Sequence, residues 1–326
     1  MRADLALIGY GNVARRFEAM LSEQRDTLQS TYNLTCRVIA TASRRHGCTA
    51  GGAACRDSFE AIAHLGRSDA DLKVVVETTT LDIERGAPAI AHVRAAFAAG
   101  CHVVTANKGP VAFAHDELTA AATAAGVRFL FEGAVMDGIP IFSLVRETLP
   151  VVRITGFEGV VNTTTNHILT AMEEGRDFDS ALAQMQADGI AEADASLDVD
   201  GWDAAAKTAA LANVLLAARM TPQDVARTGI SSGMGERARA ARTRGQRLKL
   251  VATARRDGDG RVVARVEPRE LPQDHLLAGL AGDANALVLE TDLLNRVAIC
   301  QLSGSLTQTA YALLSDLITI ARQQLG

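Results

Sequence analysis

A glycine-rich turn near the amino terminus constrains the fold of this chain more than any other feature. The apolar run Leu5–Ile8 stops at Gly9-Tyr10-Gly11, and apolar residues then recur at helical spacing, which predicts strand, tight turn and helix. The pattern is GxGxxA, ending at Ala14. Its first glycine permits the turn, its second admits a pyrophosphate, and the small third residue lets the helix pack closely. The turn therefore predicts a dinucleotide site at a helix amino terminus, with a purely structural turn as the alternative.

The same alternation of strand and helix continues along the first part of the chain. Further short apolar runs are predicted to be strands, at 38–42, 74–77, 102–105 and 127–131. Alanine-rich helical segments lie between them, such as 87–99 and 116–125. Strands that alternate with helices indicate a parallel, doubly wound sheet, so we predict an α/β domain of the Rossmann type.

Beyond Gly138-Ile139-Pro140 the alternation is lost. Helical segments are predicted at 166–175, 178–188 and 203–219, and β-rich runs at 151–161, 261–267 and 286–300. This mixture predicts a second domain of α+β class. The last segment, 309–325, has apolar residues at helical spacing and little charge, so it is predicted to be a helix.

The composition argues against several functional classes. The chain has 38 acidic and 33 basic residues and a net charge of -5, so we expect no nucleic-acid partner. A basic run over residues 237–249 is interpreted as a solvated face. The five cysteines show no metal-ligand spacing and no disulfide framework, which fits a reducing cytoplasm. No uncharged apolar stretch reaches about 18 residues, so no membrane span is expected.

The end of the second predicted strand bears on the choice of cofactor. NAD sites usually carry an acidic residue there, which binds the ribose, but this strand ends in Ser43-Arg44-Arg45. A guanidinium holds a phosphate in fork geometry and a serine adds a hydroxyl, so NADP is favoured over NAD. The alternative is that the two arginines are ordinary surface charges. The residues expected to bind the cofactor are Gly9, Gly11, Asn12, Val13, Ser43, Arg44, Arg45, Thr79 and Lys108.

Four segments carry a resemblance to a known family. Val103–Lys108 reads VVTANK, and Gly189–Asp194 reads GIAEAD and runs on through Leu197–Lys207, LDVDGWDAAAK. Two further stretches agree in position, Glu132–Pro140 (EGAVMDGIP) and Asn162–Leu169 (NTTTNHIL). These segments resemble the motifs of the homoserine dehydrogenases, and the long second block is highly specific.

The resemblance implies an oxidoreductase that interconverts L-aspartate 4-semialdehyde and L-homoserine with NADH or NADPH, on the route to threonine and methionine. It implies a dinucleotide-binding domain of residues 1–135 with 303–326, to which the C-terminal helix returns, and a substrate-binding and dimerisation domain of residues 136–302. At 326 residues the chain resembles the short, catalytic-only form, without an aspartokinase or a C-terminal regulatory domain. The resemblance therefore predicts a cytoplasmic homodimer that acts on a small molecule.

The sequence also departs from the family pattern. Thr163 stands where a glycine is common, Ile190 stands where a tyrosine is usual, and a glycine-rich loop is replaced at 302–310. The last of these resembles a loop that lies beside the cofactor. Two alternatives therefore stay open: a related reductase of another small aldehyde or ketone, and a catalytically silent sensor that binds a dinucleotide.

Carbonyl reduction leaves charge growing on oxygen, so a cation or proton donor must stand within hydrogen-bond reach. Lys207 follows Asp203 by four residues on an apolar segment, so the two side chains share one helical face. Lys207 is the only charge between Ala204 and Ala218, which favours a partly buried role over an exposed ion pair. Lys108 follows an apolar strand, and it lies either at the ligand crevice or in an exposed loop.

The resemblance implies roles for these residues. Lys207 and Lys108 would flank the reacting oxygen, and Asp203 and Glu192 would contact the hydroxyl and amino ends of homoserine. Thr164 would join them in the substrate site. For Glu192 the alternative is that it belongs to a solvated acidic run, because acidic residues crowd that part of the chain.

The segment from Glu132 resembles a loop that binds a monovalent cation, usually Na+. The resemblance implies one carboxylate ligand, from Glu132, and backbone carbonyl ligands from Val135, Asp137 and Ile139. Asp137 adds a carboxylate that many members of the family lack. The alternative is a plain hinge in which the acidic residue caps a helix.

Overall fold

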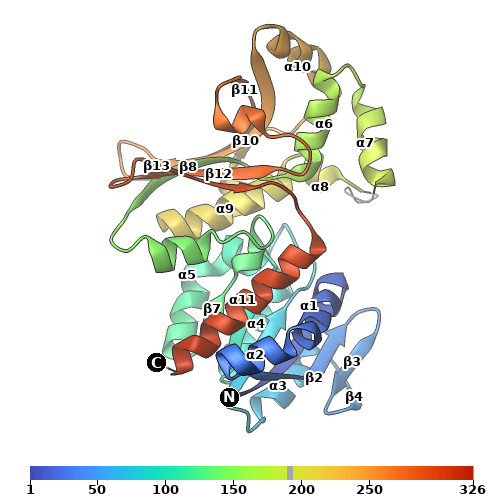
Figure 1. The fold of residues 1–326 in the computed structure, drawn as a ribbon, viewed down its shortest axis with the longest axis vertical. Coiled ribbons are helices and arrows are strands. Elements are labelled where there is room, and N and C mark those ends of the chain that lie inside the picture. Colours follow the sequence, from blue (N-terminus) through green and yellow to red (C-terminus); the bar gives the residue numbers. More distant parts are fainter. Residues whose placement is uncertain (189–193, 326) are drawn as a thin grey trace. The chain divides into compact units, whose positions relative to one another are not determined.

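The computed structural model describes residues 1–188 and 194–325. The chain forms two compact units, Met1–Leu144 with Ser305–Gly326 and Val145–Gly304. Each unit has its own β-sheet, and Figure 1 shows the two sheets with their helices. The predicted α/β class is confirmed.

The first unit is built on a seven-stranded sheet with the order β4-β3-β2-β1-β5-β6-β7. Neighbours are parallel across five of its strands, which are β2 (Thr35–Ser43), β1 (Arg2–Ile8), β5 (Leu72–Glu77), β6 (His102–Thr105) and β7 (Phe129–Leu130). Strand β1 lies between β2 and β5, so the chain adds strands first on one side of β1 and then, from β5 onward, on the other side. Such a switch point places the ligand crevice of a doubly wound sheet at the carboxyl ends of these strands.

Helices cover both faces of this sheet. On one face lie α1 (Asn12–Glu23), α2 (Arg25–Tyr32) and the C-terminal helix α11 (Leu306–Leu325), and on the other lie α3 (Ser58–Gly66) and α4 (Ala89–Ala98). Leu5 of β1, Phe17 of α1 and Leu317 of α11 share one buried cluster. The apolar spacing of the last segment is thus explained, because α11 completes the core of the first unit, and its expected return to this unit is confirmed.

One edge of the sheet departs from the expected parallel pattern. After β2 the chain turns back as β3 (Gly47–Ala50) and β4 (Ala53–Cys55), which pair antiparallel with their neighbours. Gly51 and Gly52 join these two strands with φ values of +58° and +83°. Two consecutive positive φ values are typical of a type I′ turn, whose twist matches that of a hairpin. The short runs of alanine and cysteine around these glycines gave too weak an apolar pattern to predict the hairpin.

The second unit is built on a six-stranded sheet with the order β13-β12-β8-β10-β11-β9. Its pairs are antiparallel except for β9 with β11, and the predicted α+β class is confirmed. Its strands are β8 (Ile154–Val160), β9 (Ala226–Arg227), β10 (Gln246–Arg256), β11 (Val262–Pro272), β12 (Asn285–Thr291) and β13 (Arg296–Gln301). Its helices are α6 (Thr163–Glu173), α7 (Phe178–Ala187), α8 (Ser196–Val199), α9 (Trp202–Leu216) and α10 (Met234–Thr243).

The β-rich run predicted at 286–300 is confirmed, and it forms two strands, β12 and β13, that pair as a hairpin. Two other details of the second unit differ from expectation. The helix expected over 203–219 ends at Leu216, because Ala217 adopts a left-handed φ of +48°. The basic run 237–249 is divided between α10 and β10, and Lys249 is 2% exposed, so the interpretation of the whole run as a solvated face is wrong.

Candidate active site

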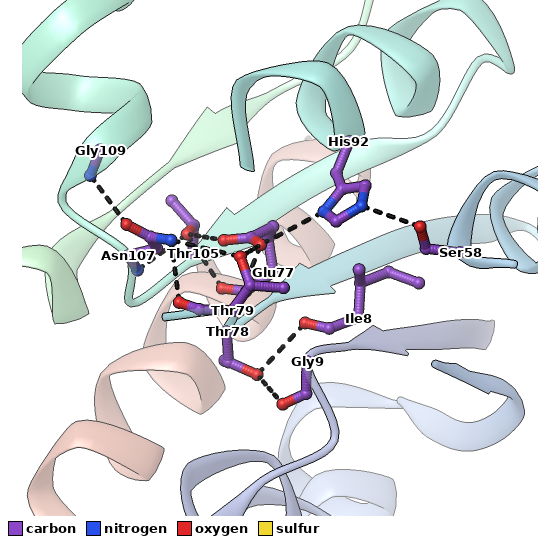
Figure 2. Close-up of polar contacts among 10 residues, drawn as sticks. All are labelled: Ile8, Gly9, Ser58, Glu77, Thr78, Thr79, His92, Thr105, Asn107 and Gly109. Carbon is purple, nitrogen blue, oxygen red and sulfur yellow. Dashed lines mark hydrogen bonds and ion pairs between the residues drawn. The ribbon is translucent and has the colours of Figure 1, made fainter. Parts of the chain in front are cut away.

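The glycine turn joins β1 to α1 at the carboxyl edge of the first sheet. Gly9 has a φ of +91°, and a Cβ there would lie 2.5 Å from the backbone carbon of Thr78, so only glycine fits. Thr78 also donates a hydrogen bond of 2.9 Å from its hydroxyl to the Gly9 carbonyl (Figure 2). A Cβ at Gly11, by contrast, would come no closer than 3.7 Å to any neighbour. Gly9 therefore serves packing, whereas Gly11 leaves room for a ligand.

The start of α1 is suited to an anion. Gly11 precedes the helix, no side chain caps it, and its first turn holds no acidic residue. Asn12 is exposed at the first helical position, and Val13 packs in part against the core. A helix amino terminus in this state offers N–H donors and positive dipole potential to phosphates. The residues expected at the pyrophosphate thus lie together at one end of the sheet.

The end of β2 forms a basic turn. The Ser43 hydroxyl accepts hydrogen bonds from the backbone amides of Arg45 at 3.1 Å and His46 at 3.3 Å, which fixes the turn. Arg44 and Arg45 are exposed, and Arg15 of α1 contacts the imidazole of His46. Several cationic or titratable side chains therefore lie near the position where an acidic residue binds the ribose in NAD sites.

A buried carboxylate connects the carboxyl ends of β5 and β6. Glu77, the last residue of β5, is fully buried, and its Oε2 accepts a hydrogen bond of 3.2 Å from the Thr105 hydroxyl. Its Oε1 accepts hydrogen bonds from the amide and hydroxyl of Thr79 and lies 3.5 Å from Nδ1 of His92. Nε2 of His92 in turn lies 2.8 Å from the hydroxyl of Ser58 (Figure 2). Neither Glu77 nor His92 was predicted, although an acidic residue that ends an apolar strand was a usable signal.

Asn107 links this network to Lys108. Its Nδ2 donates a hydrogen bond of 2.8 Å to the Thr79 carbonyl, and its Oδ1 accepts one of 2.8 Å from the Gly109 amide (Figure 2). Thr79 and Lys108 were both expected at the cofactor, and Asn107 brings their backbones into one cluster. Lys108 is half-buried at the start of α5 (Gly109–Ala124), so it does not lie in a fully exposed loop.

The second unit holds the other predicted lysine. Lys207 Nζ lies 3.0 Å from Oδ2 of Asp203, one turn earlier on α9, and both side chains are 18% exposed. The same Nζ donates a hydrogen bond of 2.7 Å to the carbonyl of Val161. The pair is therefore not the exposed ion pair that the alternative assumed. The low exposure of the pair is consistent with its position on α9, where the neighbouring alanines are buried.

Asn162 and Asp198 extend this ion pair into a cluster. Asn162 uses Oδ1 to cap α6, accepting a hydrogen bond of 2.9 Å from the Thr165 amide, so its Nδ2 is directed away from the helix. That Nδ2 donates to Asp198 at 2.7 Å and to Asp203 at 3.0 Å, and it thereby bridges the two carboxylates. The sequence analysis quoted the segments that contain Asn162 and Asp198 but named neither as a site residue.

Thr164 and Asp198 are also joined. The Thr164 hydroxyl donates a hydrogen bond of 3.0 Å to Asp198, so Thr164 lies in the cluster as expected. Burial raises the pKa of Asp198, and the charge of Asp203 raises it further, although hydrogen bonds from Asn162 and Thr164 oppose the shift. Two carboxyl groups, an ammonium group and two polar side chains therefore share one partly buried site. We call Asn162, Thr164, Asp198, Asp203 and Lys207 the lysine cluster.

Glu192 and Ile190 lie outside the described residues. Thr163, which replaces a glycine of the family pattern, accepts a hydrogen bond of 3.0 Å from Nδ2 of Asn285. In the altered loop 302–310, Ser305 accepts a hydrogen bond of 3.3 Å from the Gln308 amide at the start of α11.

Glu132 acts as a cap in the structure. Its carboxylate is buried and accepts hydrogen bonds from three successive amides, those of Ile141 at 2.6 Å, Phe142 at 2.8 Å and Ser143 at 2.7 Å. Asp137, in the same loop, has a φ of +53° and accepts a hydrogen bond of 3.0 Å from Thr309. This geometry supplies the helix-capping role that the alternative described.

A different lysine, which is not a member of the lysine cluster, is fully buried. Lys249 of β10 donates hydrogen bonds to Oδ1 of Asn166 at 2.8 Å and to the carbonyl of Leu280. Burial lowers the pKa of Lys249 to about 8. Sequence reasoning missed this residue because it lies at the end of a run of surface arginines.

Within residues 1–188 and 194–325, no helix has the length and apolar character to cross a membrane. The same residues contain no group of three or more histidine, cysteine, aspartate or glutamate side chains that could hold a metal ion.

Comparisons with known proteins show the family of this chain. A family model described as "Homoserine dehydrogenase" matches residues 140–318, and one described as "Homoserine dehydrogenase, NAD binding domain" matches residues 9–132. The match to the NAD binding domain begins at the glycine turn, and the match to the other family model contains the lysine cluster.

Individual relatives cover nearly the whole chain. An NAD(+)-dependent homoserine dehydrogenase from Pseudomonas canavaninivorans is 37% identical over 97% of this chain and 95% of its own length. A homoserine dehydrogenase from Methanocaldococcus jannaschii is 35% identical over 97% of this chain and 98% of its own length. The crystal structure of a homoserine dehydrogenase from Thiobacillus denitrificans has a TM-score of 0.87 and 31% identity, and it covers 100% of this chain and 74% of that chain. The chain therefore belongs to the homoserine dehydrogenase family.

Proposed function

We propose that the chain interconverts L-aspartate 4-semialdehyde and L-homoserine, and that Lys207 moves the proton of this reaction. The observation that carries the proposal is the position of Lys207, whose Nζ is held between Asp203 at 3.0 Å and the Val161 carbonyl at 2.7 Å. Contacts on two sides fix the direction of the ammonium group without fully burying it. A fixed, partly exposed donor suits the stabilisation of charge that grows on a carbonyl oxygen.

The remaining residues have roles around that oxygen. A nicotinamide dinucleotide, when bound, exchanges the hydride with the carbonyl carbon. In the reductive direction Lys207 donates a proton to the carbonyl oxygen, and its amine is then reprotonated. Lys108 supports the same oxygen, and Asp203 accepts a hydrogen bond from the product hydroxyl. Thr164 lines the substrate site, and Glu192, which lies outside the described residues, pairs with the substrate ammonium group.

Asp198 is proposed to favour the charged form of Lys207. A second carboxylate near Asp203 adds negative charge to the lysine cluster, which stabilises an ammonium group. Asn162 limits the repulsion between Asp198 and Asp203 because its amide donates to both of them. These two residues therefore set the charge and orientation of the groups that contact the substrate.

The cofactor site is proposed to lie at the glycine turn, with NADPH preferred over NADH. Gly9, Gly11, Asn12 and Val13 would serve the pyrophosphate, and Thr79 and Lys108 would lie near the nicotinamide end. The support for NADPH is the basic turn Ser43–Arg45, which lacks the carboxylate of NAD sites. The relative from Pseudomonas canavaninivorans is described as NAD(+)-dependent, so family membership alone does not decide the preference.

The boundaries of these roles are also proposals. Residues 1–135 with 303–326 are proposed to bind the dinucleotide, and residues 136–302 to bind the substrate and form a homodimer.

A Na+ ion would take oxygen ligands from Glu132, Val135, Asp137 and Ile139. The carboxylate of Glu132 retains acceptor capacity beside its three amide partners, which supports its proposed role as a cation ligand. Its presence would show as activation by Na+ at constant ionic strength.

A substrate panel tests the main proposal. The purified protein would be assayed for NADPH and NADH oxidation with aspartate 4-semialdehyde and with other small aldehydes and ketones. A kcat/KM that is highest for aspartate 4-semialdehyde supports the proposal. A higher value for another carbonyl compound would favour the related reductase, which Thr163 in place of the usual glycine makes a specific alternative. Tight NADPH binding without turnover of any compound would favour the silent sensor.

A further inference from the structure

The hairpin that follows the basic turn brings two cysteines together. In the register of β3 with β4, Cys48 lies directly opposite Cys55, and both are unbridged. Residues directly opposite each other on antiparallel strands project to the same face of the sheet. Figure 1 shows β3 and β4 at the outer edge of the first sheet, and both cysteines are partly exposed. The pair is therefore accessible to a small reagent.

We propose that Cys48 and Cys55 are a redox site, which a peroxide converts to an intramolecular disulfide that weakens binding of NADPH. One thiolate attacks the O–O bond of the peroxide, which gives a sulfenic acid and, after proton uptake, water or an alcohol. The second thiol attacks the sulfenic sulfur, the S–S bond forms, and the sulfenic oxygen leaves as water. Two thiols are thus oxidised by two electrons in total, and the peroxide is reduced by two.

The geometry of the strands supports this bond. In a two-residue hairpin the residues that flank the turn, here Ala50 and Ala53, are expected to be a hydrogen-bonded pair. Because the two kinds of pair alternate, Cys48 and Cys55, two residues further on, are expected to be a pair of the same kind. The Cα atoms of such a pair are about 5.5 Å apart, within the range of about 4.4–6.8 Å that disulfides span. Their Cβ atoms must approach one another, which strains the bond and makes it easy to reduce. We therefore infer a reversible bond rather than a permanent one.

The environment of the other cysteines separates them from this pair. Burial raises the pKa of Cys36 to about 12 and that of Cys101 to about 11, so neither readily forms the reactive thiolate. The pKa of Cys55 is raised as well, first by burial and then by Cys48, but of these three cysteines only Cys55 has another cysteine opposite it in the strand register. Cys300 is exposed and belongs to the second unit.

The disulfide would act on the cofactor through β3. Cys48 is paired with Ala42 of β2, and the next pair, Ser43 with Gly47, closes the basic turn. A bond that draws Cys48 toward β4 displaces it from its position opposite Ala42 and so distorts the turn. This step rests on the proposed function, since it assumes that the turn binds the 2′-phosphate of NADPH.

A single peptide reports the oxidation. The protein carrying Cys300→Ser, which removes the exposed thiol, would be treated with hydrogen peroxide, alkylated under denaturing conditions and digested with trypsin. Cleavage after Arg45 and Arg56 yields the peptide 46–56, HGCTAGGAACR, which contains both cysteines. We expect this peptide to lose two hydrogens and to escape alkylation, and dithiothreitol to restore both labels. Cys36 and Cys101 should be alkylated throughout.

The consequence is measured separately. Oxidation should raise KM for NADPH severalfold with little change in kcat, and dithiothreitol should reverse the change. The matched controls are Cys48→Ser and Cys55→Ser, each of which should be insensitive to the same treatment. Isolated sulfinic acids, or alkylation of both thiols after peroxide treatment, would overturn the disulfide. A disulfide that leaves KM unchanged would overturn the link to the cofactor. A protein that forms the disulfide but turns over no substrate would contradict the proposed function and leave the redox site standing.

Discussion

Replacement of Lys207 by alanine distinguishes a catalytic role from a structural one. As a structural residue, Lys207 contributes a charged hydrogen bond to the Val161 carbonyl and an ion pair with Asp203. A charged hydrogen bond is worth about 1.5–3 kcal/mol and an ion pair at this spacing about 0.3–0.5 kcal/mol. Lys207→Ala should therefore lower the free energy of unfolding by about 2 kcal/mol, whatever its role in catalysis.

The effect on turnover separates the two roles. If Lys207 supplies the proton, Lys207→Ala should lower kcat by roughly 10²–10⁴-fold, which corresponds to about 2.7–5.4 kcal/mol in the activation free energy. Lys207→Arg keeps the charge but holds its proton too tightly to donate it, so its kcat should also stay low. Binding of NADPH should persist in both variants.

The assay combines steady-state reduction of aspartate 4-semialdehyde with urea unfolding. Lys73→Ala is the matched control, because Lys73 also donates a hydrogen bond of 3.0 Å to a backbone carbonyl, that of Gly66, in a partly buried setting. The control should lose stability without losing turnover. A Lys207→Ala enzyme that is stable enough to assay and keeps more than about half of the wild-type kcat would refute the catalytic role.

Three further predictions concern the cofactor site and a buried charge. Gly11→Ala should leave the fold intact and raise KM for both cofactors. Gly9→Ala should destabilise the protein, because its Cβ would meet backbone atoms at 2.5 Å. Thermal unfolding compares the two variants, and equal melting temperatures would contradict the packing role of Gly9. Arg44→Ala combined with Arg45→Ala should raise KM for NADPH and spare NADH in steady-state assays, and equal losses for both cofactors would remove the 2′-phosphate assignment. Burial lowers the pKa of Lys249 to about 8 from 10.5, so between these pH values the unfolded chain binds more protons than the folded one. The wild type should therefore gain stability relative to Lys249→Met as the pH rises from about 8 to about 10.5. Urea unfolding at several pH values checks this, and a stability difference that does not change with pH would refute it.

Local pattern was enough to predict the main architecture. The apolar run before Gly9, the glycine spacing and the alternation of strand and helix predicted the parallel sheet, because each signal repeats over a few neighbouring residues. The same holds for Asp203 and Lys207, whose separation of four residues already placed them on one helical face. These predictions needed no knowledge of how distant segments meet.

The hairpin of β3 and β4 marks the limit of such patterns. Its strands are short and rich in alanine, and they lie at the edge of the sheet, so they carry little periodic apolar signal. The burial of Lys249 was missed for a related reason, since a charged residue on a central strand is stabilised by partners from other elements.

The lysine cluster depends on contacts between distant parts of the chain. Their spacing alone places Asp203 and Lys207 on one helical face, but the hydrogen bond from Asn162 to Asp203 spans 41 positions in the chain. Likewise, Glu77 meets His92 only because α4 packs beside the carboxyl end of β5. Helical and strand periodicities are set by backbone geometry over a few residues, whereas polar contacts between elements depend on strand pairing, helix packing and exclusion of water. Local patterns thus predicted most of the larger helices and strands of the first sheet, whereas the burial of charged groups beside one another depends on contacts that only the folded chain makes.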